Sequence, residues 1–271
     1  MDRKKLIIPF FKALFTKPSV ILKAIYHGIV IYDRKSFIEK KYNLLSGLPE
    51  IELTDLFPNF SETVDPFSHL YGTSLPIDLA VLKQFAKQYH ACEYLEIGSW
   101  RGESLANLSA VCKRCVSISL SDNEMKEIGL SDRTIAMQRY FSKNLQNVEH
   151  IESNSMKFDF STIGKFDLIF VDGDHRFEAV KSDTKNVFKL LKDENSIIVW
   201  HDYTEHYELI DWEVFAGILD GTPQDKIKNL YHIKNTLCAV YINKKMHSQP
   251  MNFPSIPNKR FSVDIRLTST D

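Results

Sequence analysis

The sequence predicts an α/β fold in which a mostly parallel sheet is covered by helices on both faces. Short apolar runs alternate with segments of helical periodicity, and the strongest runs are FDLIFVD at 166–172 and SIIVWH at 196–201. Strands that are apolar throughout are typical of a parallel sheet buried on both faces. The last two expected strands, 231–233 and 237–242, have a tight connection and predict an antiparallel hairpin at one sheet edge.

The other elements follow in the alternating order that such a sheet requires. Helices are expected at 77–89, 103–111, 132–144, 177–191 and 212–219, and further strands at 94–97, 115–120 and 148–152. Seven strands are therefore expected in one domain over residues 76–245. A helical and loop extension would precede it over 1–75. A C-terminal extension would follow over 246–271, with 260–267 as an additional edge strand.

Composition narrows the class of protein. The net charge of −1 over 271 residues provides no basic field for nucleic acid, so we expect no nucleic-acid partner. Four cysteines are too few for a disulfide scaffold, and the C-x-x-C of Cys112 and Cys115 lacks the second pair that a zinc ribbon needs. Since no apolar run reaches 18 residues, we expect no transmembrane helix and a cytoplasmic protein.

The N-terminal segment, residues 1–28, is basic and apolar. It carries six Lys or Arg and one acidic residue, and its apolar residues recur in helix-like groups. Two interpretations stay open: peripheral contact with the inner, anionic face of a membrane, or a helical cap packed on the main domain. Assembly into a homo-oligomer is open as well. Residues 65–74 and the aromatic loop before them are candidate lid elements, and their role stays open at this point.

The first motif is the glycine turn in EYLEIGSWRGES, residues 93–104. An apolar strand ends before Gly98, and Gly102 opens the next helix, which is where open α/β sheets bind their ligands. A dinucleotide fingerprint would require glycine at Trp100 and Glu103, so NAD and FAD are disfavoured. No G-K-[ST] occurs in the chain, which disfavours a phosphate loop.

An acidic residue two positions before the first glycine, with the next glycine four positions later, resembles the cofactor loop of class I S-adenosylmethionine-dependent methyltransferases. The stretch from VDGDH to HDY, within residues 166–203, resembles the branch that contains macrolide-sugar and aminocoumarin-sugar O-methyltransferases. The resemblance covers about residues 90–242. It implies a Rossmann-like, doubly wound sheet and methyl transfer from S-adenosylmethionine to a hydroxyl of a sugar, glycan or other small polar acceptor.

The resemblance also assigns cofactor contacts. They would come from the glycine turn and from the ends of the following strands: Glu96, Gly98, Ser99, Trp100, Gly102, Ser119, Asn154 and Asp172. Two of them depart from the pattern. Ser119 stands where an acidic residue normally binds the ribose, and Asn154 stands where Asp is frequent near the adenine.

Asp172 and Asp202 are expected to converge, because each follows one of two neighbouring strands. Two nearby carboxylates repel each other unless a cation lies between them, and oxygen ligands suit Mg²⁺. His201 is the third expected ligand, although the resembled branch has an acid there and histidine suits Mg²⁺ less well. The branch assigns the general base to the position of His175 in one group and of Asp174 in another, and we favour His175.

Two alternatives belong to other functional classes. Ser119 and His201 are compatible with a non-catalytic binding or scaffold protein in a membrane-associated assembly. Cephalosporin-hydroxylase-like proteins share the resemblance, so a hydroxylase on the same scaffold is the other alternative.

Overall fold

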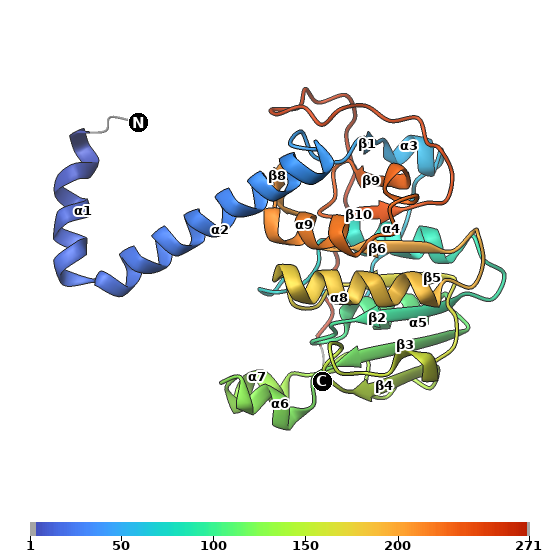
Figure 1. Cartoon of the computed structure of the whole chain (residues 1–271). Helices are drawn as coiled ribbons and strands as arrows, with labels where there is room; N and C mark the ends of the chain where they lie inside the picture. Colours follow the sequence, from blue (N-terminus) through green and yellow to red (C-terminus); the bar gives the residue numbers. More distant parts are fainter. Residues whose placement is uncertain (1–3, 270–271) are drawn as a thin grey trace.

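The computed structural model describes residues 4–269, in which an eight-stranded sheet forms the centre of the molecule (Figure 1). Its strand order is β1-β9-β10-β6-β5-β2-β3-β4. The strands are β1 (Glu50–Ile51), β2 (Glu93–Ile97), β3 (Arg114–Ser119), β4 (Val148–Glu152), β5 (Leu168–Val171), β6 (Ile197–Trp200), β9 (Leu230–Ile233) and β10 (Ala239–Tyr241), with β7 (Thr204–His206) and β8 (Leu209–Ile210) forming a separate small hairpin.

The helices connect these strands and extend the chain at its N-terminal side. The α-helices are α1 (Lys4–Thr16), α2 (Pro18–Tyr42), α3 (Leu53–Leu56), α4 (Pro76–Ala86), α5 (Glu103–Ser109), α6 (Asp122–Glu127), α7 (Asp132–Ala136), α8 (Phe177–Val187) and α9 (Trp212–Gly221). Short 3-10 helices are η1 (Phe160–Thr162), η2 (Phe188–Leu190) and η3 (Ile227–Asn229).

The predicted fold class is confirmed. Strands β6, β5, β2, β3 and β4 are parallel, and β10 pairs antiparallel with both β6 and β9. The sheet has one strand more than the seven predicted, because β1 from the N-terminal extension pairs parallel with β9. The expected edge strand at 260–267 is wrong, since these residues have no regular secondary structure. Residues 50–51 take the sheet edge instead.

Two apolar cores lie on opposite faces of the sheet, as expected for a doubly wound fold. Along β5, Ile169 and Val171 pack into the core beneath α8 and α9, whereas Leu168 and Phe170 pack into the core beneath α4 and α5. Successive side chains of a strand point to opposite faces, so a strand buried on both sides must be apolar throughout. This explains the uninterrupted apolar runs LIFV at 168–171 and IIVW at 197–200.

The N-terminal helices are only partly packed on this body. Figure 1 shows α1 and the first part of α2 projecting away from the sheet, and the end of α2 lying against α9. Arg34 pairs with Glu213 at 2.9 Å, and the Tyr42 hydroxyl donates to Asp220 at 2.9 Å. None of the helices in residues 4–269 combines the length and apolar character needed to cross a bilayer. The four cysteines are buried as free thiols.

Candidate active site

The glycine turn and the end of β5 are in direct backbone contact. Gly98 has a φ of +92°, and a Cβ built on it would lie 2.1 Å from the Asp172 carbonyl oxygen. The Asp172 amide donates to the Ile97 carbonyl at 2.8 Å, which fixes the two strand ends side by side. Glycine is therefore required at 98, both for the left-handed backbone and for the close approach.

Glu96 points into the protein beneath this turn. Its carboxylate accepts from the Tyr94 hydroxyl at 2.7 Å and from Ser104 Oγ at 2.8 Å. Burial raises the pKa of Glu96 to about 7, against the lowering effect of these bonds. The adjacent Ser99 hydroxyl is buried without a well-formed hydrogen bond among the described residues. An unsatisfied buried hydroxyl beside Gly98 fits a polar ligand at the turn.

Residues 65–74, the candidate lid, lie on the glycine turn. Ser68 Oγ donates to Glu103 Oε1 at 2.6 Å, and Arg101 Nη1 donates to the Tyr71 carbonyl at 2.9 Å. Arg101 and Glu103 pair at 3.0 Å, and both are buried. Trp100 packs under the same loop, because a Cβ on Gly72 would lie 2.7 Å from its ring. Trp100 thus has a packing role here.

The positions expected to contact ribose and adenine already have partners within the chain. Gln138 lies beside Ser119, with its side-chain nitrogen 3.4 Å from Ser119 Oγ and 2.8 Å from the Leu120 carbonyl. Asn154 Oδ1 accepts from the Met156 amide at 2.9 Å and shapes the turn after β4. Gly102 begins α5 with a φ of +82°. A ligand at this edge would meet Ser119 and the side-chain amide of Gln138. The resembled family has a carboxylate at the position of Ser119.

Asp172, His175 and Asp202 come together at the carboxyl ends of β5 and β6. Each offers a ligand atom, and these atoms lie within 4.8 Å of one another. His175 Nε2 lies 2.9 Å from Asp202 Oδ2. This hydrogen bond raises the pKa of His175 above its ordinary value. Burial opposes ionisation of Asp202, but its close contacts with His175 and His201 outweigh burial and lower the pKa of Asp202.

His201 is buried directly behind this group. Its Nε2 lies 3.1 Å from Asp78 Oδ2, and its Nδ1 lies 3.0 Å from Asp202 Oδ2 and 3.3 Å from Asp172 Oδ1. Nδ1 is close to both oxygens yet has no hydrogen-bond geometry with either. Burial opposes protonation of His201, but the surrounding carboxylates outweigh it and raise its pKa well above the ordinary value.

Asp174 faces a different partner from the other site residues. The Arg176 guanidinium binds both of its oxygens, with Nε at 2.9 Å from Oδ1 and 2.8 Å from Oδ2. Burial raises the pKa of Asp174, but the bonds from Arg176 outweigh it and hold the pKa below the ordinary value. A carboxylate stabilised in this way is a weak base, so the geometry favours His175 for proton transfer.

A divalent cation fits between Asp172, Asp202 and His201 in only one of the two tautomers of the His201 imidazole. If His201 donates from Nε2 to Asp78, the Nδ1 lone pair faces the gap between Asp172 and Asp202. Three donor atoms then converge there, which suits a cation. If Nδ1 carries the proton instead, His201 offers no lone pair to a cation at this position. The expected ligands Asp172, Asp202 and His201 are therefore brought together, with His175 as a further donor beside them.

Several residues at the site gave no signal in the sequence. Asp78 anchors His201 from 123 positions away and also accepts from the Leu75 and Leu237 amides. Its position near the start of α4 indicates only a helix cap. Ser74 Oγ donates to Asp172 Oδ2 at 3.3 Å. Tertiary contacts of this kind have no sequence periodicity, so a single sequence cannot reveal them.

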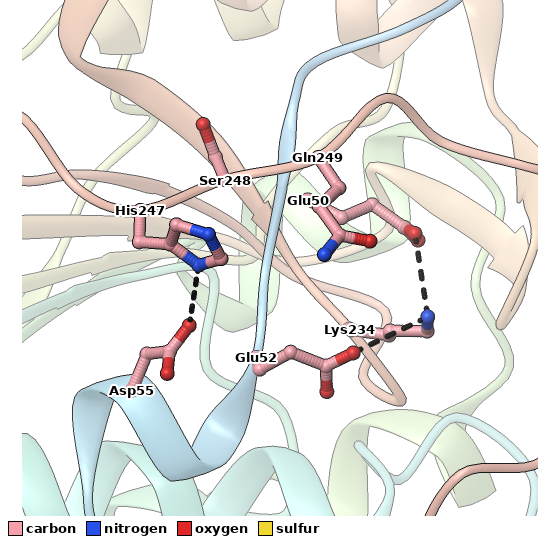
Figure 2. A pocket seen from close by; sticks show the side chains of 7 residues that line it. All are labelled: Glu50, Glu52, Asp55, Lys234, His247, Ser248 and Gln249. Carbon is pink, nitrogen blue, oxygen red and sulfur yellow. Dashed lines mark hydrogen bonds and ion pairs between the residues drawn. The ribbon is translucent and has the colours of Figure 1, made fainter.

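A polar pocket beside β1 is lined by charged side chains that form ion pairs with one another (Figure 2). Lys234 Nζ lies 3.3 Å from Glu52 and 3.9 Å from Glu50, and His247 Nδ1 lies 3.2 Å from Asp55. The Lys234 pairs join the N-terminal extension to the end of β9, and the His247–Asp55 pair joins the two chain extensions to each other. The carboxyl edge of β2, β5 and β6 therefore remains the candidate site.

Comparison with known proteins agrees with this geometry. Residues 95–203 match a family model described as a methyltransferase domain. No curated protein matches the chain significantly. Solved structures similar to it include a cofactor-bound protein from MTB, at 16% identity over 65% of this chain and 84% of that chain with a TM-score of 0.46.

Two other similar structures are those of methyltransferases. An O-methyltransferase from Bacillus cereus in complex with SAH shares 16% identity over 64% of this chain and 84% of that chain, with a TM-score of 0.44. An SAH-bound methyltransferase from Podospora anserina shares 18% identity over 64% and 80%, with a TM-score of 0.45. These likenesses are distant, so the assignment rests on the family match. Residues 95–203 form a methyltransferase domain of the class I type that the sequence predicted.

Proposed function

We propose that the protein transfers a methyl group from S-adenosylmethionine to a hydroxyl of a sugar or another small polar acceptor. The observation that carries the choice of a hydroxyl is the His175–Asp202 pair, 2.9 Å apart at the carboxyl edge of the sheet. A hydroxyl must lose its proton during methyl transfer, and a histidine oriented by a carboxylate is suited to take it.

The roles of the residues follow from this geometry. Bound at the glycine turn, S-adenosylmethionine would supply a methyl group on an electrophilic sulfonium. Gly98 lets the backbone approach the ligand, and the Ser99 hydroxyl lies beside it without a well-formed hydrogen bond to the described residues. Asp202 holds Nε2 of His175, while Nδ1 has no hydrogen-bond partner among residues 4–269. Nδ1 takes the acceptor proton as the acceptor oxygen gains the methyl group, and then releases it to solvent.

Metal assistance is a second candidate, favoured by the ligand atoms of Asp172, His175 and Asp202 that lie within 4.8 Å. A cation there would orient the acceptor hydroxyl and lower its pKa. His175 cannot bind a cation through Nε2 and remain bonded to Asp202 through the same atom. The metal-assisted candidate therefore predicts that turnover is lost when divalent metal is removed, whereas the candidate with His175 as the base predicts that turnover is retained.

The first experiment is calorimetric titration with S-adenosylmethionine and S-adenosylhomocysteine, with Mg²⁺ and with EDTA. We expect binding of both, because Gly98 leaves room for a ligand at the turn and the Ser99 hydroxyl beside it has no well-formed hydrogen bond to the described residues. Binding or turnover that requires Mg²⁺ would select the metal-assisted candidate. Absence of binding at millimolar ligand would refute the proposed function and favour the scaffold alternative, for which Gln138 beside Ser119 is the supporting observation.

The base is tested by His175→Gln, with His206→Gln as the matched control at an exposed histidine in β7. Loss of a general base typically costs 10²- to 10⁴-fold in rate, so turnover on hydroxylated acceptors should fall by roughly that factor. Affinity for S-adenosylhomocysteine should stay within about twofold, since His175 lies outside the glycine turn. Equal turnover in both variants would rule out His175 as the base.

A further inference from the structure

The first part of the chain presents apolar side chains that the rest of the molecule does not cover. From residue 11 to residue 29 every position is exposed except Ala13 and Ile21, which are intermediate. Figure 1 shows this part as an arm beyond the body of the protein. We call residues 4–32 the N-terminal arm. Exposed apolar area on this scale in a folded protein marks an interaction surface.

The apolar side chains of α2 form a stripe along the arm. Leu22, Ile25, Tyr26 and Ile29 recur at spacings of three and four residues, so they lie on one side of the helix. Their exposed fractions are 64%, 50%, 71% and 53%. Phe15 at the end of α1 is 82% exposed. Because these side chains lie along one side of α2, they can all contact one flat surface together.

The charge of this segment selects the kind of partner. Between residues 3 and 32 the sequence has no Asp or Glu and six basic residues: Arg3, Lys4, Lys5, Lys12, Lys17 and Lys23. Such a segment attracts anionic lipid headgroups, at about 1 kcal/mol for each basic residue near the surface. The same charges repel each other when two arms pair, which disfavours a second copy of the arm as the occupant.

The end of α2 is fixed to the domain, so a bound arm would set the orientation of the domain. Beyond residue 33, α2 is fixed to α8 and α9: Arg34 pairs with Glu213 and lies 4.2 Å from the Phe177 ring centroid. Phe177 begins α8, two residues after His175. In Figure 1 the arm projects on the side towards which β3 points and where α6 and α7 lie. That side is the carboxyl edge of the sheet, which carries the candidate site.

We propose that the N-terminal arm binds peripherally to an anionic lipid bilayer. The apolar stripe enters the boundary between headgroups and acyl chains, and the lysines contact the headgroups. Binding is in the plane of the surface, since none of the helices in the described residues can span a membrane. The bound arm holds the carboxyl edge of the sheet towards the lipid.

If the protein transfers methyl groups to hydroxyls, as proposed above, this orientation also suggests a class of acceptor. A hydroxyl carried by a membrane-embedded molecule, such as a lipid-linked sugar, would be presented at the bilayer surface. Vesicle binding is measured without turnover, so failure of the membrane proposal and failure of the methyl-transfer proposal can be distinguished.

The test uses the full chain with vesicles of phosphatidylcholine alone or with 30% phosphatidylglycerol, separated by flotation. We expect binding to the anionic vesicles that weakens as salt is raised. The combined change Lys12→Gln, Lys17→Gln, Lys23→Gln should lower partitioning roughly a hundredfold, from about 1 kcal/mol per lysine and a tenfold change per 1.4 kcal/mol. Lys228→Gln, Lys244→Gln, Lys245→Gln changes three exposed lysines elsewhere and should have little effect.

The apolar stripe is tested separately by Leu22→Gln, Ile25→Gln, Ile29→Gln, with Ile256→Gln, Leu267→Gln as the control at exposed apolar sites. The stripe variant should lose roughly tenfold or more in partitioning per side chain. These residues are exposed, so the domain should keep its melting temperature. Equal binding by variant and control would overturn the proposal. So would an arm-dependent dimer in light scattering together with no binding to anionic vesicles.

Discussion

Gly98→Ala separates two physical reasons for glycine at the turn between β2 and α5. The substitution adds a Cβ at a φ of +92°, where an L-residue is strained, and places it 2.1 Å from the Asp172 carbonyl oxygen. Gly164→Ala is the matched control: its φ is +87°, and no atom lies within 4 Å of the added Cβ. The difference between the two variants isolates the steric contact at the site.

The expected loss of unfolding free energy has two contributions, the strain of a left-handed backbone and the steric contact with Asp172. A non-glycine residue in the left-handed region costs about 1–2 kcal/mol, and both variants pay it. Both also gain from the lower entropy of an unfolded chain with Ala, so that gain cancels in the comparison. Carbon–oxygen contacts of this kind settle near ~3.5 Å, so relief at Gly98 needs a shift of about 1 Å or more in the end of β5. Such overpacking typically costs a further 1–3 kcal/mol.

The assay is urea unfolding of the wild type and both variants, followed by titration with S-adenosylhomocysteine. Gly98→Ala should lose about 2–5 kcal/mol of unfolding free energy, and Gly164→Ala about 1–2 kcal/mol. Because the displaced atoms belong to Asp172 and Gly173, affinity should also fall in Gly98→Ala alone. Equal losses of stability in the two variants would refute the inference that the backbone contact sets the geometry of the site.

Two further perturbations test the surroundings of the site. Glu103→Gln leaves the buried Arg101 without its counter-ion, so it should cost about 3 kcal/mol and speed proteolysis within 65–74, whereas Glu178→Gln at an exposed site should do neither. Asp220→Asn removes the acceptor shared by Lys41, Lys181 and Tyr42 and should cost about 1–2 kcal/mol at pH 7, against almost nothing for the exposed Asp225→Asn. Burial raises the pKa of Asp220, but the bonds to Lys41 and Lys181 outweigh it and lower the pKa, so this stability is present above about pH 4 and is lost as the pH falls further. A wild-type advantage over Asp220→Asn that persists unchanged at pH 2 would contradict this explanation.

The sheet could be predicted because burial on both faces leaves a strong pattern in the sequence. The runs LIFV at 168–171 and IIVW at 197–200 are apolar throughout, and each is followed directly by polar residues of the site. Strand β1 was missed because two residues, Glu50 and Ile51, carry no periodicity, and its pairing with β9 is tertiary. The C-terminal residues 260–267 alternate like a strand, yet they have no regular secondary structure, and β1 takes the edge beside β9 instead.

The candidate site could be predicted only as far as local turns define it. Asp172, His175 and Asp202 are brought together, because neighbouring parallel strands end at one edge. The bond of Asp174 to Arg176 is also local, but the sequence allows Arg176 to point into solvent equally well. Asp78 and Ser74 reach the site from another part of the chain, and their contribution depends on how the segment before β2 folds back over the glycine turn.

The N-terminal segment shows why sequence alone left two interpretations open, and how side-chain chemistry divides one helix between them. From residue 18 to residue 32, α2 contains a single Lys or Arg and no acid, whereas 33–41 reads DRKSFIEKK. The second part matches the acidic groups of α9, with Arg34 on Glu213 and Lys41 on Asp220, and Ile38 is buried between them and the body. Within residues 4–269 the first part makes no such ion pairs with the domain, and Lys23 and the apolar stripe are the groups that we propose to contact a lipid surface instead. A helix that changes partner along its length is expected to hold its domain at a fixed orientation to that surface, since an α-helix is stiff over the distance between the two parts.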